Sequence, residues 1–121
     1  MPKRAYSLDE KINQLLLLEG NYIVIPPLTL YETLRGLFVD NAIKKLALFN
    51  TMYRYLGQGE MEEADWVQAA RLYAQCKQSG HPMGDGDLLQ AAFCIRHGYT
   101  LVTHNTKHFS HLANLSIEDW V

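Results

Sequence analysis

The pattern of apolar and polar residues predicts strands that alternate with helices. Residues 22–25 and 99–103 are short apolar runs rich in β-branched and aromatic residues, and residues 115–117 form a third short run, as in buried strands. Apolar residues at helical spacing predict helices over residues 8–19, 29–38, 41–56, 61–79 and 88–97, with a further turn near 107–112. This alternation implies a parallel sheet covered by helices, so we expect an α/β fold.

Local signals at the ends of these segments support their boundaries. Ser7 and Glu10 have the S-x-x-E spacing of a capping box, and Gly20 ends the helix that they open. Gly57 and Gly59 break the chain between two predicted helices. We therefore expect an irregular connection at residues 57–59.

Length and composition indicate one soluble domain. The chain has 121 residues, of which 48% are hydrophobic and 20% are charged, as is ordinary for a globular protein, so we expect a single domain over residues 1–121. A net charge of −2 argues against a protein that grips a duplex mainly through its phosphates. No apolar run approaches the roughly 20 residues that span a bilayer, and no signal peptide follows Met1. We expect a cytoplasmic protein that does not contact a membrane.

The two cysteines fall in predicted helices. Cys76 and Cys94 lack CxxC spacing, which favours free thiols in the core, with a disulfide as the alternative.

Three segments carry candidate chemistry. Glu32 follows the first predicted strand and its two prolines, whereas Asp85 and Asp87 precede the apolar helix at 88–97. Thr103 and Asn105 follow the clearest strand. Ligands of parallel sheets bind at the carboxyl ends of the strands, which draws attention to the turns after residues 25 and 102.

In this order, the segments resemble a PIN-domain nuclease of the VapC toxin type. In that family a proline-terminated strand leads to a helix with a Glu, here Glu32, and a later helix opens with an Asp before an Ala-rich turn, here Asp87. A strand then ends in Thr-x-Asn, here Thr103 and Asn105, and a Phe follows, here Phe109. The resemblance covers residues 21–120 and implies a three-layer fold in which helices flank a short central parallel sheet.

The resemblance also implies a metal-dependent endoribonuclease of a toxin–antitoxin pair. Glu32 and Asp87, with Asp85 as a helper, would be ligands of Mg²⁺ or Mn²⁺, and Thr103 and Asn105 would hold the ligand network. Such ions prefer carboxylate oxygens, and they activate water and stabilise phosphoryl charge. The implied partners are RNA, a cognate antitoxin protein that covers the acidic pocket, and a second copy of the chain in a homodimer.

The sequence departs from the family pattern at its start. Family members open with a central apolar strand that ends in Asp, whereas this chain begins almost directly in its first helix, and Asn105 stands where many members carry Asp. We therefore expect the first strand to be missing. The neighbouring strands would pair directly, another chain would fill the gap, or the gene start was placed too far downstream. The alternative function is a catalytically inactive PIN-like protein that binds nucleic acid or protein.

Each candidate residue also has a purely structural interpretation. Glu32 completes a capping box with Thr29, Asp85 has the form of a helix N-cap, and Asp87 suits the positive end of a helix dipole. Thr103 and Asn105 are typical of turns.

A zinc site is a weaker interpretation of the histidines. His104 and His108 are four residues apart and His111 follows, but zinc needs a third ligand from a rigid element. A helix that starts near residue 106 would leave His104 outside it, so the spacing disfavours zinc there.

Overall fold

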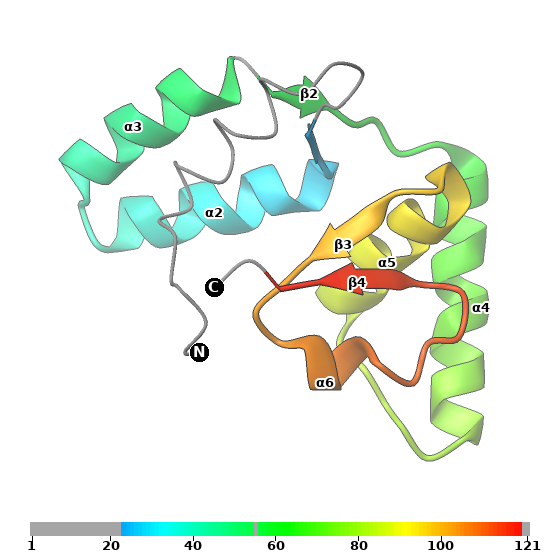
Figure 1. Cartoon of the computed structure of the whole chain (residues 1–121). Coiled ribbons are helices and arrows are strands. Elements are labelled where there is room, and N and C mark those ends of the chain that lie inside the picture. The colour runs from blue at the N-terminus through cyan, green and yellow to red at the C-terminus, as the bar shows by residue number, and fades with distance from the viewer. Residues whose placement is uncertain (1–22, 55, 120–121) are drawn as a thin grey trace, which may run out of the picture.

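The computed structural model describes residues 23–54 and 56–119 (Figure 1). The helix predicted over residues 8–19 lies outside the described residues. The elements in chain order are β1 (Val24–Ile25), α2 (Pro27–Val39), α3 (Ile43–Tyr53), β2 (Gly57–Gln58), α4 (Glu63–Gln78), α5 (Asp85–His97), β3 (Thr100–Val102), α6 (Thr106–Phe109) and β4 (Ser116–Glu118). This order confirms the predicted α/β class.

The strands form two separate parallel pairs. β1 pairs with β2, with Val24 opposite Gly57, and β3 pairs with β4, with Leu101 opposite Ile117. The parallel direction was predicted, but the described residues hold no strand that joins the two pairs into one sheet. Direct pairing of β1 with β3, one of the arrangements expected for a missing strand, is therefore wrong.

β2 was not predicted, because its glycines signalled only a break. The Gly57 N–H donates a hydrogen bond to the Ile23 carbonyl at 2.7 Å, and the Gly59 N–H donates to Ile25 at 3.0 Å. A Cβ on Gly59 would collide with the Phe93 ring of α5. Glycine is required here by the close approach of this backbone to α5, in addition to its ability to turn.

Two helices begin earlier than predicted. α2 starts at Pro27, where a proline at the first helical position loses no hydrogen bond. α5 starts at Asp85 after the N-cap residue Gly84, so Asp85 and Asp87 both lie in its first turn. The interpretation of Asp85 as an N-cap is therefore wrong. α5 ends as expected at Gly98, whose φ of 70° is left-handed.

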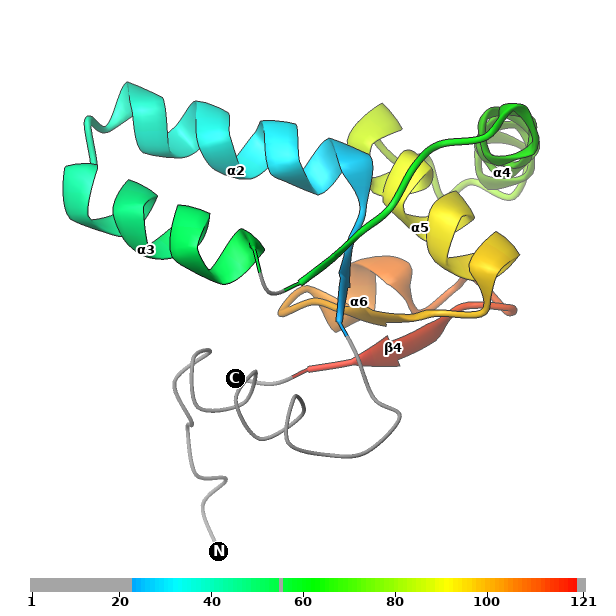
Figure 2. The same ribbon diagram turned by 90° about the horizontal axis from the view of Figure 1, so that it is seen from above.

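The core lies between α4, α5 and the β3–β4 pair. Its centre is Leu88, Ala91 and Ala92 on α5, together with Cys76 of α4 and Leu101 of β3. Both cysteines are buried and free, which confirms that prediction. α2 and α3 form a helical hairpin that extends to one side of this core (Figures 1 and 2), and neither helix has a buried residue.

None of the helices in the described part of the chain has the length and apolar character needed to cross a membrane.

Candidate functional site

Glu32 lies where α2 meets the start of α5. Its Oε1 accepts a hydrogen bond of 2.7 Å from the Gln90 amide, and its Oε2 lies 3.7 Å from Nη2 of Arg35. A Cβ added to Gly86 would lie 3.2 Å from the same Oε2. Glu32 does not cap its helix, because α2 begins at Pro27 with no side-chain cap. The capping-box interpretation is wrong, and the carboxylate instead faces the residue next to Asp87.

Asp87 is held by a histidine from another element. Nε2 of His108 in α6 donates a hydrogen bond of 2.8 Å to Oδ2 of Asp87. Both side chains are partly exposed, so the carboxylate remains open to solvent. Gln90, which donates to Glu32, lies three residues after Asp87 on α5, and residues three apart are neighbours on one helix face, so α5 brings these two acids to one region.

Asp85 faces a different neighbour. It lines a hollow with Trp66, Ala69 and Tyr73 of α4. Residues two apart on a helix point to nearly opposite sides, since each residue turns the helix by about 100°. The structure therefore brings Glu32 and Asp87 into one region and places Asp85 toward α4.

Thr103 and Asn105 shape the turn that delivers α6. The Thr103 N–H donates to the Glu118 carbonyl at 3.0 Å, which extends the β3–β4 pairing by one bond. The Thr103 hydroxyl accepts a 3.1 Å hydrogen bond from the Asn105 N–H, and Asn105 is the residue before α6. This turn leads into α6, and α6 carries His108 to its contact with Asp87. The Thr-x-Asn segment therefore positions His108, and neither of these hydrogen bonds involves the two acids.

The predictions missed two residues of this region. Gln90 is a polar residue inside an otherwise apolar stretch of α5, and that interruption was the available signal. His108 was considered only as a zinc ligand. The three histidines instead contact separate partners, since His104 lies 3.5 Å from Asp119, His108 contacts Asp87 and His111 lies beside Cys76.

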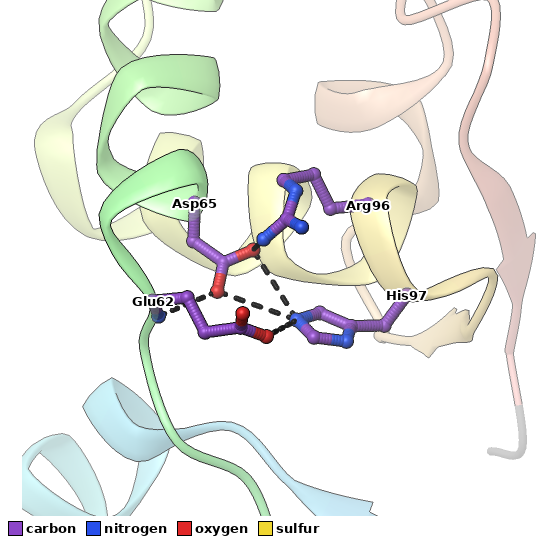
Figure 3. A network of polar contacts seen from close by, with 4 residues as sticks. All are labelled: Glu62, Asp65, Arg96 and His97. Atoms are coloured by element: carbon purple, nitrogen blue, oxygen red, sulfur yellow. Dashed lines mark hydrogen bonds and ion pairs between the residues drawn. The ribbon is translucent and has the colours of Figure 1, made fainter.

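A second polar cluster joins the start of α4 to the end of α5 (Figure 3). Oδ1 of the fully buried Asp65 accepts a 2.8 Å hydrogen bond from Arg96, and its Oδ2 accepts one of 2.8 Å from the Glu62 N–H. Nε2 of His97 lies 3.3 Å from Asp65, and 3.9 Å from Oε1 of Glu62.

This cluster has the composition of a metal site but is satisfied without one. Ligand atoms of Glu62, Asp65 and His97 lie within 4.8 Å of one another. However, the Arg96 guanidinium already supplies the positive charge at Asp65. The cluster's His97 also lies ten residues after Asp87 on α5, which is about 15 Å along the helix axis. We interpret it as a structural connection and Glu32 with Asp87 as the candidate metal ligands.

An apolar hollow of about 300 Å³ adjoins the acidic region. Gln90 lines this hollow and also donates its hydrogen bond to Glu32. The other lining residues come from the start of α2, the start of α4 and α5: Pro26, Pro27, Leu28, Tyr31, Met61, Trp66, Leu89 and Phe93.

Comparisons with known proteins agree on one family. The family model of the PIN domain matches residues 3–115. Ribonuclease VapC1 of Haemophilus influenzae (strain R2866) is 25% identical over 127 residues, which cover 99% of this chain and 89% of that protein. Ribonuclease VapC2 of Rickettsia felis (strain ATCC VR-1525 / URRWXCal2) is 31% identical over 118 residues, which cover 93% and 85%.

Solved structures show the same fold. The structure of VapBC2 from Rickettsia felis, bound to a DNA fragment from their promoter, has a TM-score of 0.78 at 28% identity and covers 95% of this chain and 87% of that chain. The structure of DNA-bound VapBC from Salmonella typhimurium has a TM-score of 0.80 at 23% identity and covers 93% and 83%.

Proposed function

Because the chain belongs to the PIN-domain family and to its VapC ribonuclease branch, we propose that it is a metal-dependent endoribonuclease of a toxin–antitoxin pair. The observation that carries the proposal is the approach of Glu32 to the first turn of α5, where Asp87 lies. The two carboxylates come from helices far apart in sequence. Each is oriented by one hydrogen bond, from Gln90 and from His108.

Glu32 and Asp87 fit a divalent ion that keeps part of its water shell. Mg²⁺ and Mn²⁺ prefer carboxylate oxygens, and Mg²⁺ is commonly bound through one or two carboxylates. Asp85 is the weaker third candidate, because it lines the hollow against α4. A bound ion would polarise the phosphodiester and supply an activated water.

The chain's own side chains would orient these groups. Gln90 fixes Oε1 of Glu32, and His108 fixes Oδ2 of Asp87, as outer hydrogen-bond partners commonly do for metal ligands. Arg35 lies beside Glu32 with more than half of its side chain exposed, so it can turn toward an RNA phosphate. Thr103 and Asn105 keep α6, and with it His108, in place.

One observation favours a second candidate, a non-catalytic PIN-like binding protein. The β1–β2 and β3–β4 pairs are not joined by any strand among residues 23–54 and 56–119. We propose that the family's central strand, with its Asp, is the part that would join them. Without that third carboxylate the ion would be held weakly, and the fold could act through binding alone.

The first test is Mn²⁺ binding by calorimetry. We expect the 121-residue chain to bind one ion in the low-affinity range, and Glu32→Gln to weaken binding by at least about tenfold, because the amide removes a charged ligand. The matched control is Glu63→Gln, an exposed carboxylate in the first turn of α4, which should leave binding unchanged.

A version extended by an apolar strand ending in Asp separates the two candidate functions. Tighter binding by the extended chain, with Glu32 needed in both, supports the nuclease. If only the extended chain binds Mn²⁺, the acidic region of this chain is not sufficient, and the binding function is favoured. Equal binding by the wild-type chain and Glu32→Gln would exclude Glu32 as a ligand.

We also propose an antitoxin and a second copy of the chain as partners. The Rickettsia structure is of a VapBC complex. In this chain, the apolar hollow beside Glu32 is bordered by the exposed Tyr31 and Trp66, and such a surface suits an apolar segment of a partner protein.

A dimer is expected from the exposed apolar side chains of the hairpin and from strand edges that no strand among the described residues covers. Phe38, Val39 and Ile43 are 63%, 84% and 71% exposed around the α2–α3 turn. Light scattering at micromolar concentration should give about twice the 13.9 kDa chain mass. Phe38→Ser should shift the mass toward the monomer, with Lys44→Ser as an exposed control on α3. A sharp monomer mass for the wild-type chain would contradict the dimer.

A further inference from the structure

At the C-terminal end of α4, the backbone of His81 folds back onto that of Cys76. Gly80 has a left-handed φ of 79°, the His81 N–H donates to the Cys76 carbonyl at 2.8 Å, and the Gly80 N–H donates to Lys77 at 3.4 Å. These two bonds form a Schellman motif, in which a side-chain contact between the positions of Cys76 and His81 is common. The backbone therefore fixes the spacing of this pair.

A second histidine reaches the same place from a distant part of the chain. Nε2 of His111, after α6, lies 3.6 Å from Sγ of Cys76. The His81 and His111 rings lie 5.0 Å apart between their centres. One thiol and two imidazoles thus converge from α4, the α4–α5 connection and the α6–β4 connection.

We propose that Cys76, His81 and His111 form a binding site for a soft divalent ion, with zinc as the expected metal. This site is separate from Glu32 and Asp87 and does not depend on the proposed nuclease function. Thiolate and imidazole are the ligands that select zinc, whereas carboxylates suit Mg²⁺ and Mn²⁺. A water would complete the coordination.

Two of the three separations match those that zinc imposes. With Zn–S of about 2.3 Å and Zn–N of about 2.0 Å at tetrahedral angles, a bound sulfur and nitrogen lie about 3.5 Å apart. Two imidazoles on one such ion have ring centres about 5 Å apart. The Cys76–His111 and His81–His111 separations are close to these values. The ligand atoms of Cys76, His81 and His111 do not all lie within 4.8 Å of one another in the metal-free chain. Because His81 is exposed, rotation of its side chain can bring a ring nitrogen toward the same point.

Metal binding here exchanges a proton for the ion. Burial raises the pKa of the Cys76 thiol, so the metal-free side chain keeps its proton and donates toward His111. When the Sγ–metal bond forms, the thiol proton leaves to solvent, since a coordinating thiol is deprotonated. The ion would then connect the segment that leads into α5 to the segment that follows α6. Those segments adjoin the helices that carry Asp87 and His108.

The test is titration of the reduced 121-residue chain with Co²⁺ and Zn²⁺, in the absence of other metals. We expect one equivalent of Co²⁺ to produce the thiolate-to-cobalt charge-transfer absorption, Zn²⁺ to displace it, and about one proton to be released. Cys76→Ala should abolish the absorption. It should also weaken zinc binding by more than about 100-fold, because even outer-shell partners are worth about 10- to 100-fold. His111→Gln should abolish the tetrahedral spectrum.

Matched variants separate this site from the other clusters. Cys94→Ala removes the second buried thiol and should leave the cobalt spectrum intact. His97→Asn and Asp87→Asn should also leave the cobalt spectrum intact, because they change only the Asp65 cluster and the acidic region, which lie outside this site. If Cys76→Ala does not fold, His81→Asn and His111→Gln change only exposed side chains and still decide the result. Cobalt binding without the thiolate-to-cobalt band, or zinc binding that is unchanged in these histidine variants, would overturn the proposal.

Discussion

Replacing Asp65 with alanine is expected to lower the free energy of unfolding by about 2–4 kcal/mol, because it leaves several polar partners without their hydrogen-bond acceptor at once. Asp65 is fully buried and accepts hydrogen bonds from Arg96 and from the Glu62 N–H, with His97 at 3.3 Å. Without the carboxylate, the Arg96 charge lies against the α4–α5 contact with no counter-ion in the described structure. Its partial exposure allows some hydration, which keeps the loss from being larger.

Urea denaturation of the wild-type chain, Asp65→Ala and Asp65→Asn measures this effect. Asparagine keeps the volume and can still accept from the Glu62 N–H, so its loss should be smaller. Glu63→Ala is the matched control, because this exposed acid lies in the same helical turn and should change stability by no more than about 0.5 kcal/mol. A loss below about 1 kcal/mol in Asp65→Ala would contradict the role assigned to the cluster.

The same carboxylate predicts how stability depends on pH. Burial of Asp65 raises its pKa, but hydrogen bonds from the Glu62 N–H, His97 and Arg96 outweigh burial and hold the pKa below the ordinary value of 3.8. A carboxyl whose folded pKa is lowered stabilises the protein above its unfolded pKa, and the contribution disappears as pH falls through the folded pKa. The stability difference between the wild-type chain and Asp65→Asn should therefore be constant near neutral pH and shrink below about pH 4.

The sequence pattern predicted the helices and strands of the core well, because their apolar residues are spaced for burial against one another. It could not predict β2, since Gly57 and Gly59 carry no apolar signal and pair with β1 only through the backbone. It also could not predict the Asp65 cluster. Asp65 and Arg96 look like ordinary surface charges until α4 and α5 pack.

The sequence pattern allowed us to nominate the acids of the candidate site but not the residues that surround them. Glu32 and Asp87 were found through the order of the family motifs, and Thr103 and Asn105 through the turn after β3. Gln90 and His108 contact the two acids only because α2 and α6 fold against α5, so no local spacing reveals them.

Asp87→Asn should leave the fold intact and reduce Mn²⁺-dependent RNA cleavage by more than about 100-fold, because loss of a charged metal ligand exceeds the effect of losing an outer-shell partner. Stability should change by no more than about 1 kcal/mol, since the Asp87–His108 pair is partly exposed. Cleavage of a labelled RNA, with circular dichroism on the same samples, measures both effects. Asp40→Asn, an exposed acid at the end of α2, should cleave as the wild-type chain does.

His108→Leu distinguishes a ligand from the residue that orients it. The variant keeps the Asp87 carboxylate but removes its 2.8 Å hydrogen bond, so cleavage should fall by about 10- to 100-fold, and higher Mn²⁺ concentrations should restore part of it. Asp87→Asn should not be restored in this way, because the ligand itself is gone. If Asp87→Asn cleaves RNA as fast as the wild-type chain, the activity does not arise at this region. If the wild-type chain does not cleave at all, yet it and Asp87→Asn bind a partner equally well, the fold serves binding and Asp87 only favours the start of α5.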